Sequence, residues 1–156
     1  MLFTLVLFTY NQEKFIAEAV KAVLHQKCNP IEILITDDNS SDKTFDIVKE
    51  YLKNYKGPHK IILNRNEKNV GLLKQIDIAH QISSGDVIIG AAGDDVSNLD
   101  RCQKIIDCFK KDNPLLVFSY ANVIDKNGNK ASRSFKNATL YRTKNIFKVA
   151  KSGKLY

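Results

Sequence analysis

The fold of this chain is indicated by the stretch Ile33-Leu-Ile-Thr-Asp-Asp-Asn-Ser-Ser-Asp-Lys-Thr44, in which an apolar run of strand length ends in the acid pair Asp37-Asp38. The same arrangement occurs in Gly85-Asp-Val-Ile-Ile-Gly-Ala-Ala-Gly-Asp-Asp95, which ends in Asp94-Asp95. In an open α/β sheet the carboxyl ends of the strands form the ligand crevice, so we expect both pairs to face one site. Four carboxylates would repel one another there without a cation or hydrogen-bond donors, which indicates a metal ion and a polar ligand.

Apolar runs of strand length alternate with helical patterns along the chain. Helical patterns place apolar residues three or four positions apart, whereas buried parallel strands are short continuous apolar runs. Regular alternation predicts an α/β fold with a doubly wound, mostly parallel sheet and helices on both faces. The predicted strands cover residues 1–8, 31–36, 60–64, 86–91 and 115–120, and the predicted helices cover residues 12–25 and lie around 45–52, 72–82 and 102–109.

Local signals refine these elements. Asn11 is predicted to cap the first helix, and Ser40, Ser41 or Asp42 the second. The pair Asn127-Gly128 is a hairpin turn signal. The third helix is expected to end near Gly85 and to turn its apolar residues inward, namely Leu72, Leu73, Ile76, Ala79 and Ile82.

The composition predicts one globular domain. The chain has 156 residues and 44% apolar content, which is enough to build one core. Cys28, Cys102 and Cys108 lack zinc-site spacing, so they are expected to be buried thiols in a reducing compartment. The apolar start at residues 1–8 has no basic n-region or cleavage site and is shorter than the about 20 residues of a membrane span. The cytoplasm is therefore the expected location.

The net charge of +7 comes from one end of the chain. Residues 126–156 contain nine of the 24 basic residues and no acidic residue. The other 15 basic residues are outnumbered by all 17 acidic residues, which leaves residues 1–125 with a net charge of −2. Nucleic-acid binding is therefore not expected. The basic segment is expected either to meet phosphates of a membrane surface or ligand, or to remain solvated.

Four motifs lie in register with the predicted strand ends, and together they resemble a known family. They are Thr9-Tyr10-Asn11, Asp37-Asp38-Asn39-Ser40-Ser41-Asp42-Lys43-Thr44, Asn69-Val-Gly71, and Ser84-Gly85-Asp86 leading to Gly93-Asp94-Asp95. Paired acids and Asn-x-Gly turns are each common, but the four motifs in this order resemble the nucleotide-binding half of family 2 glycosyltransferases with the GT-A fold. The resemblance covers residues 5 to about 128.

The resemblance implies a divalent cation at the second acid pair. Mn²⁺ or Mg²⁺ binds carboxylate and phosphate oxygens and would neutralise the diphosphate of a nucleotide-sugar donor. By resemblance, Asp95 is the metal ligand, and Asp94 faces the ribose or the other ligands of the metal. The alternative is that Asp94 and Asp95 cap the helix that follows.

The resemblance also implies the nucleotide contacts. Asp38 is expected to accept the ring N–H of uracil, while Asp37 caps the loop backbone. Thr9 and Tyr10 are expected to line the base pocket by backbone contact and ring stacking, unless Tyr10 is a packing residue. Lys74, in the first turn of the third helix, is expected to reach the diphosphate or to remain solvated.

Two positions depart from the family pattern. Phe8 stands where proline is usual, and Ala92 replaces the first acid of the common Asp-x-Asp pattern. The acceptor subsite and the acidic catalytic base of the family lie further along the chain, and no Asp or Glu follows Asp125. We therefore expect residues 1–125 to be the nucleotide-sugar-binding core, residues 126–156 to begin a truncated acceptor-side region, and the base to lie beyond Tyr156.

These features predict an inverting glycosyltransferase that uses a nucleotide-diphosphate sugar, UDP-linked, and a glycan or lipid-linked acceptor in bacterial surface polysaccharide synthesis. A non-catalytic nucleotide-binding module is the main alternative. A signalling receiver module would carry its acid pair after the first strand, whereas here the pairs follow the second and fourth. A nucleotidyltransferase would carry a glycine-rich basic loop after the first strand, and Thr9-Tyr-Asn-Gln12 contains neither glycine nor lysine.

Overall fold

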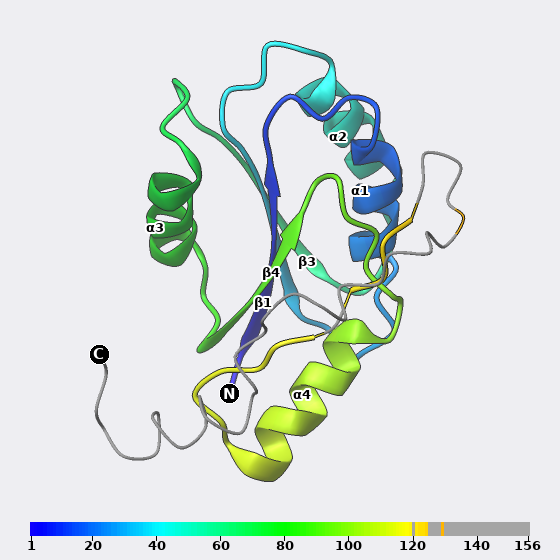
Figure 1. Ribbon diagram of the computed structural model, residues 1–156, viewed down its shortest axis with the longest axis vertical. Helices are drawn as coiled ribbons and strands as arrows, with labels where there is room; N and C mark the ends of the chain where they lie inside the picture. The colour runs from blue at the N-terminus through cyan, green and yellow to red at the C-terminus, as the bar shows by residue number, and fades with distance from the viewer. Residues whose placement is uncertain (120, 125–128, 130–156) are drawn as a thin grey trace. The chain divides into compact units, whose positions relative to one another are not determined.

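The computed structural model describes residues 1–119, 121–124 and 129. Strands and helices alternate as predicted (Figure 1). The chain divides into two compact units, Met1–Ile106 and Asp107–Tyr156, and the sheet belongs to the first. The elements are β1 (Phe3–Thr9), α1 (Ile16–Leu24), β2 (Glu32–Asp37), α2 (Thr44–Lys53), β3 (Lys60–Arg65), α3 (Leu72–Ile82), β4 (Val87–Ala92) and α4 (Arg101–Asp112).

The four described strands form one sheet in which every neighbouring pair is parallel. Their order is β3-β2-β1-β4, so β1 and β2 are central and β3 and β4 are edge strands. The two central strands are buried almost throughout, whereas both edge strands are largely half-buried. Strands covered on both faces require continuous apolar runs, which explains Leu5-Val-Leu7 and Ile33-Leu-Ile35.

Helices cover both faces of this sheet. Figure 1 shows α3 on one face and α1 and α2 on the other. On the α3 side, Val6, Leu34 and Ala79 are completely buried together. This arrangement confirms the predicted doubly wound α/β fold. On the opposite side, the buried residues of α1 are Ile16, Ala19, Val20, Ala22, Val23 and Leu24.

The first helix begins later than predicted. It starts at Ile16, because residues 12–15 form a turn in which Phe15 N–H donates to the Gln12 carbonyl at 2.9 Å. Asn11 has a φ of 51° and does not cap the helix, so that prediction is wrong. The N-cap residue of α2 is Lys43, so the prediction that Ser40, Ser41 or Asp42 holds this position is wrong. Asp42, one residue earlier, accepts the N–H of Thr44 at 2.9 Å.

The inward face of α3 also differs from the prediction. Leu72 is 60% exposed and Leu73 is 81% exposed, while Gln75 and Ala79 are buried. The Gln75 side chain donates to the carbonyl of Thr36 at 2.8 Å, near the end of β2. The first turn of α3 therefore extends beyond the strand ends, where the sheet offers no apolar surface to cover Leu72 and Leu73.

The fifth predicted strand is not formed over residues 115–119. A strand requires backbone hydrogen bonds to a neighbouring strand, and an apolar run alone does not provide them. Tyr120 and the predicted turn at Asn127-Gly128 lie outside the described residues. The predicted division of the chain at residues 125 and 126 stays a prediction.

The cysteines differ in burial. Cys102 is buried, Cys28 is half-buried and Cys108 is exposed, so the prediction of three buried thiols is wrong for Cys108. Cys108 lies away from the buried face of α4, which is formed by Cys102 and Ile106. Burial raises the pKa of the Cys102 thiol to about 12, which keeps it protonated and unreactive. Among the described helices, none has the length and apolar character needed to cross a membrane.

Candidate functional site

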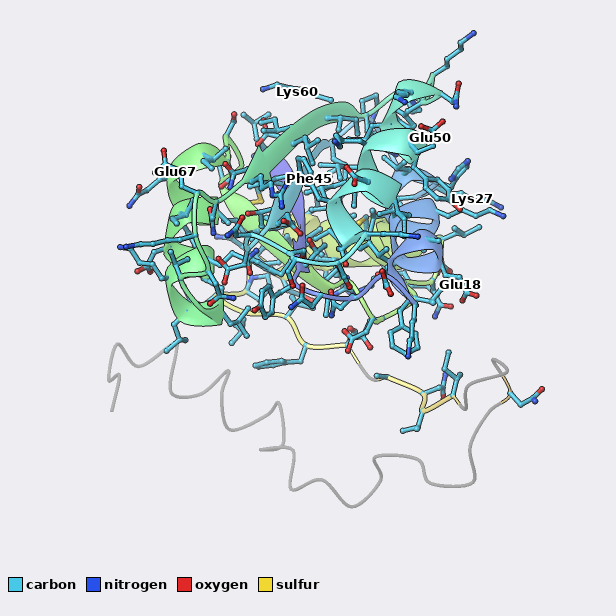
Figure 2. The ribbon with its side chains drawn as sticks, turned by 90° about the horizontal axis from the view of Figure 1, so that it is seen from above. Glu18, Lys27, Phe45, Glu50, Lys60 and Glu67 are labelled. Carbon is cyan, nitrogen blue, oxygen red and sulfur yellow. The ribbon has the colours of Figure 1, made fainter. Side chains whose placement is uncertain are left out.

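Apart from Lys74, the predicted site residues lie at the carboxyl ends of the strands. The parallel register pairs Thr9 with Asp37, Asp37 with Arg65, and Phe8 with Ala92. Asp38 directly follows β2, and Asp94-Asp95 follows β4 by one residue. Both acid pairs therefore occur at the same edge of the sheet, and Figure 2 views the molecule from above this edge.

Asp37 is completely buried, and its carboxylate is occupied by hydrogen-bond donors. It accepts Thr9 Oγ1 at 3.1 Å, Ser40 N–H at 2.9 Å and the Ser40 hydroxyl. Arg65 Nε lies 3.5 Å from the same carboxylate and supplies the compensating positive charge. Asp37 thus fastens the loop after β2, which agrees with its predicted role as a cap for that loop.

Asp38 is only 2% exposed, but its carboxylate is not fully occupied. Asn66 Nδ2 donates to Oδ1 at 2.8 Å, and Val70 N–H donates to the same oxygen at 2.9 Å. Gly71 N–H donates to Oδ2 at 2.8 Å. A carboxylate offers about four acceptor positions, so one position on Oδ2 remains after these bonds within the described structure. Asp38 clamps the loop at residues 66–71 and can accept one further donor.

Thr9 and Tyr10 are neighbours with opposite environments. Thr9 is 2% exposed, its hydroxyl donates to Asp37, and its carbonyl accepts the N–H of Asp38 at 2.9 Å. Tyr10 is 47% exposed, and its hydroxyl has no hydrogen-bond partner among the residues that the structure describes. The Tyr10 ring is therefore open to stacking by a ligand, whereas Thr9 is part of the framework beneath it.

The second acid pair is exposed at the end of β4. Asp94 and Asp95 lie in a turn in which Asp95 N–H donates to the Ala92 carbonyl at 3.1 Å. Within residues 1–119, 121–124 and 129, neither carboxylate has a hydrogen-bond or ion-pair partner. Helix α4 begins only at Arg101, so the two acids do not cap it and that alternative is wrong.

Gly93 brings this turn against the loop after β1. Its N–H donates to the Phe8 carbonyl at 2.9 Å, and a Cβ at Gly93 would clash with the side chain of Gln12. Gln12 Oε1 in turn accepts the N–H of Tyr10 at 3.3 Å. The segment that carries Tyr10 and the turn that carries Asp94-Asp95 are therefore close neighbours, and a larger residue at position 93 would displace the end of the Gln12 side chain.

The chemistry of the exposed pair fits a hard divalent cation. The described part of the chain contains no group of three or more His, Cys, Asp or Glu side chains arranged to hold a metal ion. Mg²⁺ in nucleotide sites uses one or two carboxylates together with phosphate oxygens and water, and Mn²⁺ prefers the same oxygen ligands. Asp95 and Asp94 can supply that number of carboxylates. Their roles as metal ligand and neighbouring acid stay predictions.

Lys74 lies in the first turn of α3, three residues after Gly71, whose φ is 78°. The Lys74 side chain is 59% exposed, and its ammonium lies 3.9 Å from the carboxylate of Asp77. An exposed ion pair of this kind contributes about 0 to 1 kcal/mol, so a phosphate can compete for the ammonium. The predicted contact with a diphosphate stays a prediction.

Comparison with known families agrees with this geometry. The sequence profile of the family described as Glycosyl transferase family 2 matches residues 4–154, which include every site residue named above. The chain belongs to glycosyl transferase family 2. The dTDP-rhamnosyl transferase RfbG of Shigella flexneri is 33% identical over 125 residues, which cover 76% of this chain and 39% of RfbG. The chain spans 36% to 44% of the length of three further curated relatives.

Solved structures show the same fold. Staphylococcus aureus TarS 1–349 in complex with UDP-GlcNAc superimposes with a TM-score of 0.69 at 24% identity, over 85% of this chain and 37% of TarS. The mannosyltransferase PcManGT of Pyrobaculum calidifontis, in complex with GDP-Man and Mn²⁺, has a TM-score of 0.66 at 16% identity, over 72% of this chain and 33% of PcManGT. At these identities the likeness establishes the GT-A-type fold of this family 2 chain.

Three polar residues of the family 2 site were not predicted from the sequence. Arg65 stacks on the ring of Phe45, labelled in Figure 2, at 4.6 Å and donates to the Ser40 carbonyl at 2.8 Å. Asn66 and Gln75 bond Asp38 and the strand ends. Of these three residues, only Gln75 could have been found from the sequence, since it is a polar residue on a helix face that must pack on the sheet. Arg65 and Asn66 resemble ordinary exposed loop residues.

Proposed function

We propose that this chain is the donor-binding part of an inverting glycosyltransferase. It serves transfer of a sugar from a UDP-linked donor to a glycan or lipid-linked acceptor in bacterial surface polysaccharide synthesis. The observation that carries this proposal is the contrast between the two acid pairs at one sheet edge. Asp37-Asp38 is buried and bonded, while Asp94-Asp95 is exposed without a partner in the described structure. Adjacent unpartnered carboxylates are suited to binding a cation.

In this proposal, each part of the donor is bound by a different residue of the chain. The Tyr10 ring stacks on the base, and the remaining acceptor position of Asp38 takes a ring N–H. Asp95 would hold Mn²⁺ or Mg²⁺, which would neutralise the diphosphate, and Asp94 would lie toward the ribose or the other ligands of the ion. Lys74 approaches the diphosphate from α3. When bound, the ion neutralises the charge that develops on the leaving nucleotide.

The residues assigned here act on the donor alone. In an inverting transfer, a base removes the proton of the acceptor hydroxyl, which attacks the anomeric carbon opposite the leaving nucleotide. We assign no residue of this chain to that base. The donor-binding residues lower the barrier by fixing the donor and stabilising its leaving group. The basic residues of 126–156 are proposed to take part in acceptor binding, including binding to an anionic membrane surface at the cytoplasmic face.

The number of acceptor positions at Asp38 favours uracil or thymine over guanine. Uracil and thymine each present one ring N–H, which matches the single open position. Guanine presents a ring N–H and an amino group side by side and would require two. Named relatives support a nucleotide-sugar donor but differ in the base, since the TarS structure contains UDP-GlcNAc, PcManGT contains GDP-Man and RfbG is named for dTDP-rhamnose.

A thermal-shift panel tests the proposal. The chain is heated with UDP, dTDP, GDP or ADP, each with Mn²⁺ or with EDTA. A ligand at 100 times its Kd adds about 2.7 kcal/mol to the stability of the folded state and so raises Tm. UDP with Mn²⁺ is expected to raise Tm most, because it is the proposed ligand of the site. If dTDP raises Tm as much as UDP does, the proposed site stands, but the base of the donor is not restricted to uracil. If no nucleoside diphosphate raises Tm, or if ADP raises it as much as UDP, the proposed function is wrong.

A further inference from the structure

Two loops at the site edge are tied together residue by residue. They follow β1 and β2 and are about 30 positions apart in the sequence. Three successive N–H groups of the first loop donate to side chains that alternate along the second. The bonds run from Asn11 N–H to Ser40 Oγ at 2.9 Å, from Gln12 N–H to Thr44 Oγ1 at 2.7 Å and from Glu13 N–H to Asp42 Oδ2 at 3.0 Å.

The second loop donates back to the first. Ser41 N–H donates to Asn11 Oδ1 at 2.8 Å, and Lys43 N–H donates to Glu13 Oε2 at 3.1 Å. Asn11 is in the left-handed region, with a φ of 51°, a conformation that Asn tolerates better than most non-glycine residues. We call these reciprocal bonds between residues 11–13 and 40–44 the interlock.

Tyr10 lies between two fixed segments. On one side, the Thr9 carbonyl accepts the N–H of Asp38, and on the other side the interlock begins at Asn11. The Tyr10 side chain has no hydrogen-bond partner in the described structure, so the backbone on either side determines where its ring lies. A shift of Asn11 would therefore move the ring relative to Asp38.

Four of the eight interlock residues are exposed, whereas Ser40 and Thr44 are buried. Asn11, Glu13, Ser41 and Lys43 are all exposed, so they bury little apolar surface. Each neutral hydrogen bond contributes a net of about 1 kcal/mol, and bonds at the surface compete with water. Their effect on global stability is therefore limited. Holding a binding loop in one conformation has a second effect, since it removes the cost of ordering that loop when a ligand binds.

We propose that the interlock positions the Tyr10 ring beside Asp38 for binding the nucleoside of the donor, and that Asn11 and Glu13 are positioning residues for this step. The inference rests on the proposed function, because it assigns the ligand of the same site. In this account the polar residues at 40, 42 and 44 serve the backbone of the neighbouring loop. They do not touch the donor.

A matched pair at Asn11 tests this role. Asn11→Gly adopts the left-handed backbone without strain and removes only the side-chain acceptor, whereas Asn11→Asp keeps an acceptor and tolerates the same backbone. Binding of UDP is measured by calorimetry and binding of uridine by NMR titration, at a temperature where circular dichroism shows each variant folded. Uridine carries no phosphate, so its affinity is not affected by repulsion from the charge that N11D adds.

The expected result is about fivefold weaker binding of both uridine and UDP by N11G, with N11D within about twofold of wild type for uridine. Glu13→Ala is expected to behave like N11G and Glu13→Gln like wild type, which provides a second pair from an exposed side chain. If N11G and Glu13→Ala lower Tm but leave both affinities within twofold, the interlock is only structural and the inference is wrong. If wild type binds neither UDP nor uridine, both the proposed function and this inference are wrong.

Discussion

The two acid pairs look alike in the sequence but differ in the structure. Asp37 and Asp38 are 0% and 2% exposed and accept bonds from several loops, whereas Asp94 and Asp95 are exposed. The difference follows from strand order. β2 lies between β1 and β3, so loops on both sides supply donors, while β4 pairs only with β1 in the described sheet. The acids after β2 are therefore bonded into the framework, with one acceptor position of Asp38 left, whereas the acids after β4 stay open to a ligand.

The largest expected effect is a difference in protein stability between substitutions in the two acid pairs. Asp37→Ala is expected to lower the free energy of unfolding by about 3 to 4 kcal/mol, because Arg65, Thr9 and Ser40 lose a shared partner. Asp94→Ala is expected to change it by at most about 0.5 kcal/mol. Urea unfolding of both variants provides the comparison. Equal effects would mean that burial does not distinguish the pairs.

The opposite edge of the sheet contains a third acid of the framework kind. Glu32 accepts Thr4 Oγ1 at 2.9 Å, Ser84 N–H at 2.7 Å and Lys60 Nζ at 2.8 Å. Burial raises the pKa of Glu32, but the hydrogen bonds from Lys60, Ser84 and Thr4 outweigh it and lower the pKa from its usual 4.5 to about 2. This difference corresponds to about 3 kcal/mol of stability at neutral pH.

The Glu32 contribution has a defined pH window. Because its pKa is lowered in the folded state, its stabilisation is complete above about pH 4.5 and is lost as the pH falls toward 2. We expect Glu32→Gln to be less stable than wild type at pH 7 and to approach it in stability at pH 2.5. Unfolding free energies at both pH values give the difference. A constant difference between the two proteins would contradict the assignment.

A smaller effect is expected where framework and ligand site meet. Asp38→Ala should weaken UDP binding by about one to two decades, because it removes a charge-assisted acceptor worth about 1.5 to 3 kcal/mol. Asn66→Ala is the control, since it removes one donor to Asp38 and leaves the carboxylate. If both variants lose the same affinity in calorimetry, Asp38 acts only through the loop at residues 66–71 and does not contact the base.

The location of both acid pairs could be predicted because parallel strands end at one edge of a sheet. Strand positions followed from apolar runs, and Lys60–Asn64 was predicted where β3 covers Lys60–Arg65. The burial of the pairs could not be predicted, because the local sequence, Asp-Asp after an apolar run, is the same after a central strand and after an edge strand. Strand order, which decides between them, depends on contacts between distant segments.

Contacts between loops were the second feature that could not be predicted from the sequence. Asn11 resembles a helix cap, because Asn is common at that position, but its side chain instead bonds Ser41, 30 residues away. Leu72 and Leu73 continue the apolar period of α3, yet the helix begins beyond the strand ends. Local patterns therefore predicted the elements, and the details that shape the site came from the way their ends meet.

The most direct test of the central claim compares the two ends of β4. Calorimetry measures UDP binding with and without Mn²⁺ by wild type, Asp95→Ala and Asp86→Ala, where Asp86 is an exposed acid just before β4 that contacts the N-terminus. We expect Mn²⁺ to tighten binding about tenfold, or about 1.4 kcal/mol, in wild type and Asp86→Ala, and to have no effect in Asp95→Ala. A full Mn²⁺ effect in Asp95→Ala would contradict the assignment of the exposed pair to the metal.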